Sequence, residues 1–88
     1  MAHSKSARKR VRQDVERRDR NRYWRKRLRT QLKKMRGALE TRDTARVNEL
    51  LRPTLALVDH TKSAGHIHAN TAARLKSRLT RQSNALSA

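Results

Sequence analysis

The chain has 88 residues and a formal net charge of +17, with 24 lysines and arginines against 7 aspartates and glutamates. This length allows one small domain with a modest core, and the absence of cysteine excludes disulfides and thiolate metal sites. No apolar run approaches the roughly 20 residues that a membrane-spanning helix needs. So large an excess of positive charge predicts a polyanionic partner, and nucleic acid carries the densest negative charge.

The basic residues are unevenly distributed along the chain. Residues 1–36 carry sixteen of them against three acids, a net of +13, and residues 65–88 carry four and no acid. Residues 37–64 carry four of each sign and are neutral. Blocks of like charge are typical of solvated or interacting segments, so we expect the two ends to contact the partner and the neutral middle to hold them in place.

Helix breakers are few, namely Gly37, Pro53 and Gly65, which favours an all-α fold. A first helix from about residue 5 to residue 40 would be on the order of 50 Å long. One apolar stripe at three- and four-residue spacing comprises Trp24, Leu28, Gln31, Leu32, Met35, Ala38 and Leu39. Because Trp24 continues the stripe, it is interpreted as a core residue rather than as a base-stacking residue.

The apolar stripe does not continue upstream of Trp24. Val11 and Val15 project to a different side of the helix, and residues 16–22 contain no apolar side chain. Residues 1–22 therefore have good helix formers but nothing to pack against. We expect this basic extension to fray when alone and to become ordered as helix on a polyanion.

A second helix is predicted to begin at Asp43, which can cap it, with Thr41 as the competing cap. Its expected packing face comprises Val47, Leu50, Leu51, Leu55 and Val58. Pro53 removes one backbone hydrogen bond within this stretch, so we expect a kink or a late start. Gly65 is expected to end the helix in the left-handed conformation.

The third helix is predicted to run from about Ile67 or His68 to about Asn84. Its expected packing face comprises His68, Ala72, Leu75, Leu79, Gln82 and Leu86. A separate basic face comprises Arg74, Arg78 and Arg81, with Asn70 and Ser77 at its edge. The predicted architecture is a three-helix bundle in a single domain, residues 1–88, whose long, basic first helix extends beyond the core.

Neither catalysis nor metal binding is indicated by the sequence. It contains no Gly-rich phosphate loop, nucleophile elbow or HExxH arrangement, so we expect no enzyme activity and no small-molecule substrate. Asp14, Glu16 and Asp19 are surrounded by arginine, which indicates ion pairing, and they argue against an organelle transit peptide. His66 and His68 would point apart on a helix, so we expect no metal and no cofactor; His68 should pack or hydrogen-bond where the third helix begins.

The basic residues indicate phosphate binding rather than an ordinary solvated surface, because they occupy every side of residues 5–29 and few acids balance them. Helix-turn-helix and zinc-finger patterns are absent. Two aromatics, Tyr23 and Trp24, are too few for a single-stranded base platform. Recognition of backbone and shape remains, which favours folded RNA over DNA.

Two other classes of function stay open at this point. One is a histone-like or chaperone-like nucleic-acid binder with no fixed site. The other is a cationic helix that lies on anionic membranes, which would carry its basic residues on one side of an apolar-faced helix. Residues 5–22 instead carry charge all round, which disfavours the membrane class.

The segment Gly65–Leu79, GHIHANTAARLKSRL, closely resembles the signature of the bacterial small-subunit ribosomal protein number twenty family. The matching residues are Gly65, Ile67, His68, Asn70, Ala72, Ala73, Arg74, Lys76, Ser77, Arg78 and Leu79. The N-terminal half is similar to that family at Met1-Ala2, Lys5-Ser6-Ala7, Lys9-Arg10, Arg12, Arg17, Arg20-Asn21, Arg22, Thr30, Lys33 and Lys34. The likeness covers essentially the whole chain.

The resemblance implies a three-helix protein that binds small-subunit ribosomal RNA directly, early in assembly, and stabilises its fold by phosphate neutralisation and shape recognition. It further implies few or no protein contacts, no membrane, and a place in the cytoplasmic ribosome of a bacterium rather than of a plastid. The RNA-binding residues predicted from charge and likeness are Lys5, Ser6, Arg8, Lys9, Arg10, Arg12, Arg17, Arg20, Asn21, Arg22, Arg25, Arg29, Lys33, Lys34, His68, Asn70, Arg74, Lys76, Ser77, Arg78 and Arg81.

Overall fold

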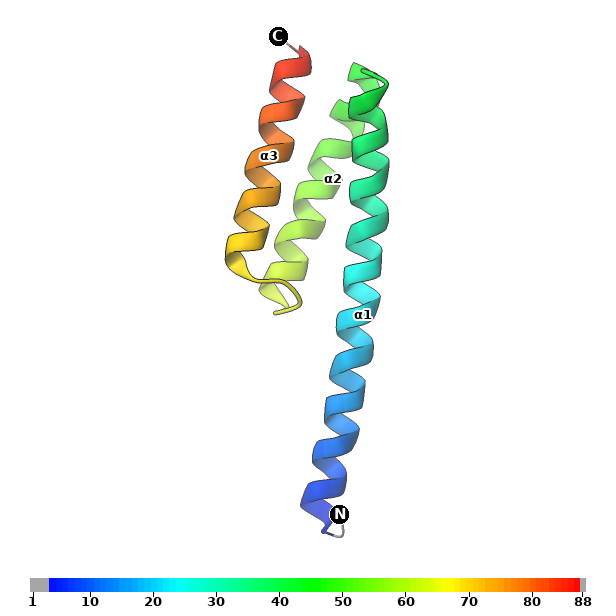
Figure 1. Ribbon diagram of the computed structural model, residues 1–88, viewed down its shortest axis with the longest axis vertical. Coiled ribbons are helices and arrows are strands. Elements are labelled where there is room, and N and C mark those ends of the chain that lie inside the picture. Colours follow the sequence, from blue (N-terminus) through cyan, green and yellow to red (C-terminus); the bar gives the residue numbers. More distant parts are fainter. Residues whose placement is uncertain (1–3, 88) are drawn as a thin grey trace.

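The computed structural model describes residues 4–87, which form three helices and, within that range, no strand (Figure 1). Helix α1 spans Lys5–Glu40, α2 spans Thr44–Ser63 and α3 spans Ala69–Ser87. Helix α2 lies between the other two and packs against both of them (Figure 1). The predicted all-α fold with a long first helix is confirmed.

The first helix is much longer than the bundle to which it belongs. At 36 residues it extends about 54 Å, whereas α2 and α3 have 20 and 19 residues. The Cα radius of gyration is 17.5 Å, against about 12 Å for a compact chain of this length. The N-terminal part of α1 accounts for the excess, because it projects past the ends of α2 and α3 (Figure 1). We call its residues 5–20 the overhang; apart from half-buried Ala7, their side chains are exposed.

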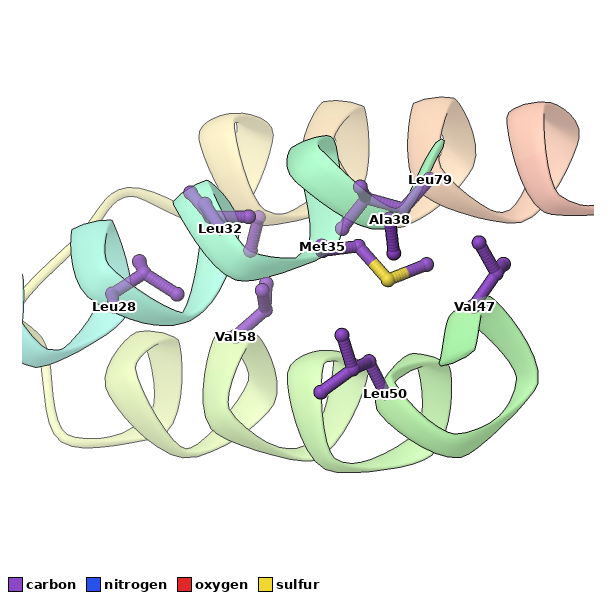
Figure 2. Packing of buried hydrophobic residues seen from close by; sticks show 9 residues of the cluster. Leu28, Leu32, Met35, Ala38, Val47, Leu50, Val58 and Leu79 are labelled. Carbon is purple, nitrogen blue, oxygen red and sulfur yellow. The ribbon is translucent and has the colours of Figure 1, made fainter. Parts of the chain in front are cut away.

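The core lies where the C-terminal half of α1 packs against α2 and α3 (Figure 2). Its buried apolar residues are Leu28, Leu32, Met35, Ala38, Val47, Leu50, Val58, Ala72 and Leu79. The predicted stripe of α1 is therefore confirmed, with Trp24, Gln31 and Leu39 half-buried at its edges. In the predicted packing face of α2, Leu51 and Leu55 lie at the margin of the core and are partly buried.

Three buried hydroxyl residues, Thr54, Thr61 and Ser83, lie in the core although the predicted packing faces omit them. Each hydroxyl donates to the backbone carbonyl four residues earlier, at distances of 2.7, 2.6 and 2.8 Å respectively. Because the polar group is satisfied within its own helix, burial costs little. By contrast, His68 and Gln82 are exposed, so their assignment to the packing face of α3 is wrong.

Capping side chains set where α1 ends and α2 begins. Asp43 Oδ1 accepts a hydrogen bond from the Arg46 amide at 3.2 Å, which confirms Asp43 as the N-cap of α2. Thr41 instead closes α1, since its hydroxyl donates to the Gly37 carbonyl at 3.1 Å. Pro53 lies inside α2, which runs from Thr44 without interruption, so a late start is wrong. Pro53 is exposed, and water can satisfy the carbonyl that lacks a donor.

Helix α3 begins at Ala69 because His68 caps it. His68 Nδ1 accepts a hydrogen bond from the Asn70 amide at 3.0 Å, which confirms that His68 hydrogen-bonds where this helix starts. The helix ends at Ser87, about one turn beyond the predicted end near Asn84. Leu86, which packs against the core, accounts for the longer helix.

The two glycines of the chain should respond to substitution in opposite directions. Gly65 has φ of +82° in the turn after α2, as predicted, whereas Gly37 lies within α1. A Cβ at either position would meet no atom within 4 Å, so backbone conformation alone decides the effect. We expect Gly65→Ala to lower the free energy of unfolding by about 1 kcal/mol and Gly37→Ala to raise it by about 0.5–1 kcal/mol. Urea denaturation followed by circular dichroism measures both, and equal shifts of the two midpoints would contradict this assignment.

Candidate nucleic-acid interface

The overhang carries basic side chains around its whole circumference. Successive residues of an α-helix are rotated by about 100°, so basic residues at irregular spacing point in every direction. Those of the overhang are Lys5, Arg8, Lys9, Arg10, Arg12, Arg17, Arg18 and Arg20, all exposed. Such a rod suits insertion between several phosphate backbones rather than contact with one flat surface.

The acids of the overhang do not pair with its arginines. The sequence predicts ion pairs for Asp14, Glu16 and Asp19, yet within residues 4–87 none of these carboxylates lies within 4.0 Å of a basic group. The prediction is wrong because an exposed ion pair gains too little to hold two flexible side chains together. Asp14, Glu16 and Asp19 therefore do not neutralise the arginines around them.

A line of arginines runs along one flank of α1, the flank that faces α3 further along the helix. Arg18, Arg22, Arg25 and Arg29 recur at three- and four-residue spacing, so they share this flank, and they line one shallow hollow. Further along, Arg36 lines a second hollow between α1 and α3. Its remaining lining residues are Leu32, Glu40, Leu75, Arg78, Leu79 and Gln82. We call the two hollows together the α1–α3 surface. On this surface the predicted residues Arg25 and Arg29 lie on the same side of the molecule as Arg78.

A second groove lies on the other flank of α1, between α1 and α2. It is lined by Tyr23, Lys26, Arg27, Thr30, Gln31, Lys34, Pro53 and Leu57, and we call it the α1–α2 groove. Of its cations only Lys34 belongs to the predicted RNA-binding set. The predicted set does not include Arg27 or Lys26, which lines both hollows, nor Arg18 and Arg36 on the opposite flank. Helical spacing relative to the apolar stripe could have found all four, because it separates the two flanks of α1.

The basic side chains of α3 divide into an exposed set and one inward pair. Arg74, Arg78 and Arg81 are exposed, as the predicted basic face requires. Lys76 instead pairs with Asp59 of α2, with its Nζ at 2.9 and 3.1 Å from the two carboxylate oxygens. This pair links α2 to α3. Because both side chains are nearly half exposed, it contributes about 1 kcal/mol at most to the free energy of unfolding.

Asn21 and Arg25 attach α1 to the turn that precedes α3. The Asn21 carboxamide oxygen contacts Nδ1 of the buried His66 ring, and Arg25 Nε donates to the His66 carbonyl at 3.1 Å. The Trp24 ring stacks on His66 at a centroid distance of 6.2 Å and lies 4.6 Å from the ring of His60. The bundle is thus joined to α1 immediately after the overhang, which sets the direction in which the overhang projects.

The remaining predicted residues are exposed but separated by the fold. Ser6 lies on the overhang and Lys33 on α1, whereas Asn70 and Ser77 lie on α3. The overhang projects away from α3, so one compact site does not unite them (Figure 1).

Among residues 4–87, no group of three His, Cys, Asp or Glu side chains could hold a metal ion. In the same range, none of the helices combines the length and apolarity needed to cross a membrane.

Comparisons with known proteins match nearly the whole chain. The family described as Ribosomal protein S20 matches residues 2–84. Small ribosomal subunit protein bS20 of Geobacter metallireducens is 43% identical over 86 residues, which cover 98% of this chain and 99% of that protein. The bS20 protein of Bordetella avium is 44% identical with the same coverage. That of Geotalea daltonii is 41% identical over 87 residues, 99% of this chain and 100% of the relative.

Proposed function

The chain belongs to the ribosomal protein S20 family, and on that premise we propose that it binds the RNA of the small ribosomal subunit directly and stabilises the fold of that RNA during assembly. As a ribosomal protein it is a structural constituent and not an enzyme. Its relatives are bacterial small-subunit proteins, which supports the bacterial cytoplasmic ribosome as its location. We propose few or no protein contacts there, because nearly all of its exposed charge suits phosphate.

The separation of charge from core carries this proposal. The apolar core joins the three helices, while the first 36 residues alone carry a net of +13. The α1–α3 surface and the α1–α2 groove lie on opposite flanks of α1, so each can meet a different segment of the RNA. Exposed arginine contacts phosphate through two N–H groups at once. The protein neutralises phosphates and braces RNA helices against one another.

We further propose that the basic extension becomes ordered only on RNA; of residues 1–22, residues 1–3 lie outside the described part of the chain. The overhang has no packing side, so it lacks the tertiary packing that supplies most of a helix's stability in a protein. Like charges four residues apart, as at Lys5 and Lys9 or Arg18 and Arg22, weaken it further. Phosphates remove that repulsion, so helix formation and RNA binding are coupled.

The test compares two ligands across a salt titration. Full-length protein is bound to small-subunit ribosomal RNA and to an equal mass of random-sequence duplex DNA. Raising the salt concentration weakens both complexes, because the release of counterions on binding becomes less favourable. A site that matches the shape of its RNA retains the part of its affinity that does not come from phosphate contacts. We expect a preference for the ribosomal RNA that survives to about 0.3 M salt.

Two results would contradict the proposal. If the affinities for the ribosomal RNA and the duplex DNA fall in parallel as salt rises, the protein is a histone-like binder with no fixed site. Binding to vesicles of anionic lipid that withstands the same salt would indicate a membrane-surface helix.

A further inference from the structure

Tyr23 lines the α1–α2 groove, and Trp24 lines a neighbouring hollow that shares Arg27, Pro53 and Leu57 with it. Tyr23 is 58% exposed, an unusual position for an aromatic side chain in so polar a helix. Its ring meets the Trp24 ring edge to face, with centroids 5.4 Å apart and planes at 82°. Trp24 itself packs against His60, and the Arg27 guanidinium carbon lies 5.1 Å from its ring centroid. The Tyr23 ring is therefore exposed, and its contact with the packed Trp24 ring restricts its orientation.

The groove beside Tyr23 combines an apolar wall with a cationic rim. Pro53 and Leu57 of α2 supply the apolar part, and Lys26, Arg27 and Lys34 of α1 supply three positive charges. A neighbouring hollow continues it past Trp24, Arg27, Pro53, Ala56, Leu57 and His60. No acidic side chain lines either hollow among residues 4–87. An occupant with a flat apolar part and a negative charge next to it fits this surface.

We propose that the α1–α2 groove binds one unpaired base of an RNA, stacked on the Tyr23 ring, with the adjoining phosphates held by Lys26, Arg27 and Lys34. This rests on the proposed function, since RNA is the ligand in both. Every base has a face that stacks on an aromatic ring, and unpaired bases are the ones free to do so. An acidic protein helix would satisfy the three cations but would leave the Tyr23 ring without a matching flat partner. Double-stranded RNA would likewise satisfy only the cations.

The test uses two single-stranded oligomers of equal phosphate number, one an oligouridylate and the other abasic. The full chain and its Tyr23→Leu and Tyr23→Phe variants are titrated with each at low salt. Stacking on one aromatic ring contributes about a tenfold change in affinity when lost. We expect Tyr23→Leu to weaken oligouridylate binding about tenfold and abasic binding not at all, while Tyr23→Phe retains the affinity for both. Emission of Trp24, the one tryptophan of the chain, should change with oligouridylate and not with the abasic oligomer.

Matched controls make each outcome decisive. Val15→Leu changes another exposed apolar residue of α1, away from the groove, and should leave both affinities unchanged. Equal binding of oligouridylate by wild type and Tyr23→Leu would overturn the base site and leave phosphate binding intact. Failure of both oligomers to bind, while small-subunit ribosomal RNA is still bound, would overturn the base site and leave the proposed function intact. A polyglutamate peptide that reproduced the Tyr23-dependent change in Trp24 emission would overturn the base site in favour of an acidic protein partner.

Discussion

Replacing Arg18, Arg22 and Arg29 together by glutamine should weaken binding to small-subunit ribosomal RNA about 100- to 500-fold at about 0.1 M salt. The three side chains are exposed on one line of the α1–α3 surface and can meet successive phosphates of one backbone. Each phosphate contact adds a slope of roughly 0.7 to 0.9 to the dependence of log Kd on log salt, which is about 5- to 8-fold per contact at this salt. Binding isotherms at several salt concentrations should therefore show both the weaker affinity and a slope smaller by about 2 to 3.

A second triple variant removes the same number of positive charges from another part of the surface and serves as the control. Arg42, Arg52 and Lys62 are exposed and lie in the α1–α2 turn and on α2, away from both basic flanks of α1. Their replacement by glutamine should weaken binding less than tenfold and change the slope by less than about 1. Equal losses in the two triple variants would mean that net charge, and not the α1–α3 surface, determines affinity. Arg25 stays unchanged in both, because its side chain also holds the His66 carbonyl.

Truncating Met35 should lower the free energy of unfolding by about 2–5 kcal/mol. Met35 is fully buried and points into the centre of the cluster, between residues of α1 and α2 (Figure 2). Met35→Ala leaves a cavity that the three helices can only partly close. Since a domain of this size has a stability of about 5 kcal/mol, the free variant should be close to unfolding at 25 °C. Urea titration followed by circular dichroism measures the loss.

An exposed apolar residue provides the control for that substitution. Val11 lies on the overhang and is 54% exposed, so Val11→Ala should change the free energy of unfolding by no more than about 0.5 kcal/mol. A similarly small effect of Met35→Ala would contradict the position of the core given by the structure.

Local chemistry explains which parts of the fold could be predicted. The stripe from Leu28 to Leu39 repeats with the period of a helix, and a helix must bury such a stripe. Asp43 and Gly65 act through their own backbone neighbourhood, so their roles as cap and terminator follow from residue type. The threonines Thr54 and Thr61 could not be assigned to the core in this way. Hydropathy assigns a hydroxyl residue to the surface. Only the helix geometry shows that each hydroxyl donates a hydrogen bond to the carbonyl four residues earlier.

The turn between α1 and α2 carries no sequence signal of its conformation. Arg42 has φ of +56°, in the left-handed region that glycine normally occupies. The Asp43 amide donates to the Ala38 carbonyl at 3.1 Å, and this hydrogen bond across the turn accompanies the unusual conformation. The Arg42 amide also donates to the Leu39 carbonyl at 3.2 Å, so the two hydrogen bonds form the Schellman ending of α1. Glycine is the usual residue at this position, and an arginine there gives no sequence signal of the motif.

For the candidate site, charge predicted the ligand class but not which cations have partners within the protein. Lys76 pairs with Asp59 across 17 positions, and Asn21 contacts His66 across 45. Both contacts depend on how the helices pack, which local periodicity does not determine. The RNA contacts of the individual residues remain predictions, and the flanks on which Lys26 and Arg36 lie add to them.

Binding of RNA by the overhang is tested most directly by hydrogen exchange of the backbone amides of the full chain, alone and on small-subunit ribosomal RNA. We predict that amides of the overhang exchange rapidly in the free protein and become protected on RNA. Amides of residues 32–38, a segment of α1 that buries Leu32, Met35 and Ala38 in the core, should be protected in both states. Protection of the overhang already in the free chain would contradict ordering on RNA. Rapid exchange of the overhang in the bound chain would contradict the proposal that its basic side chains hold the RNA.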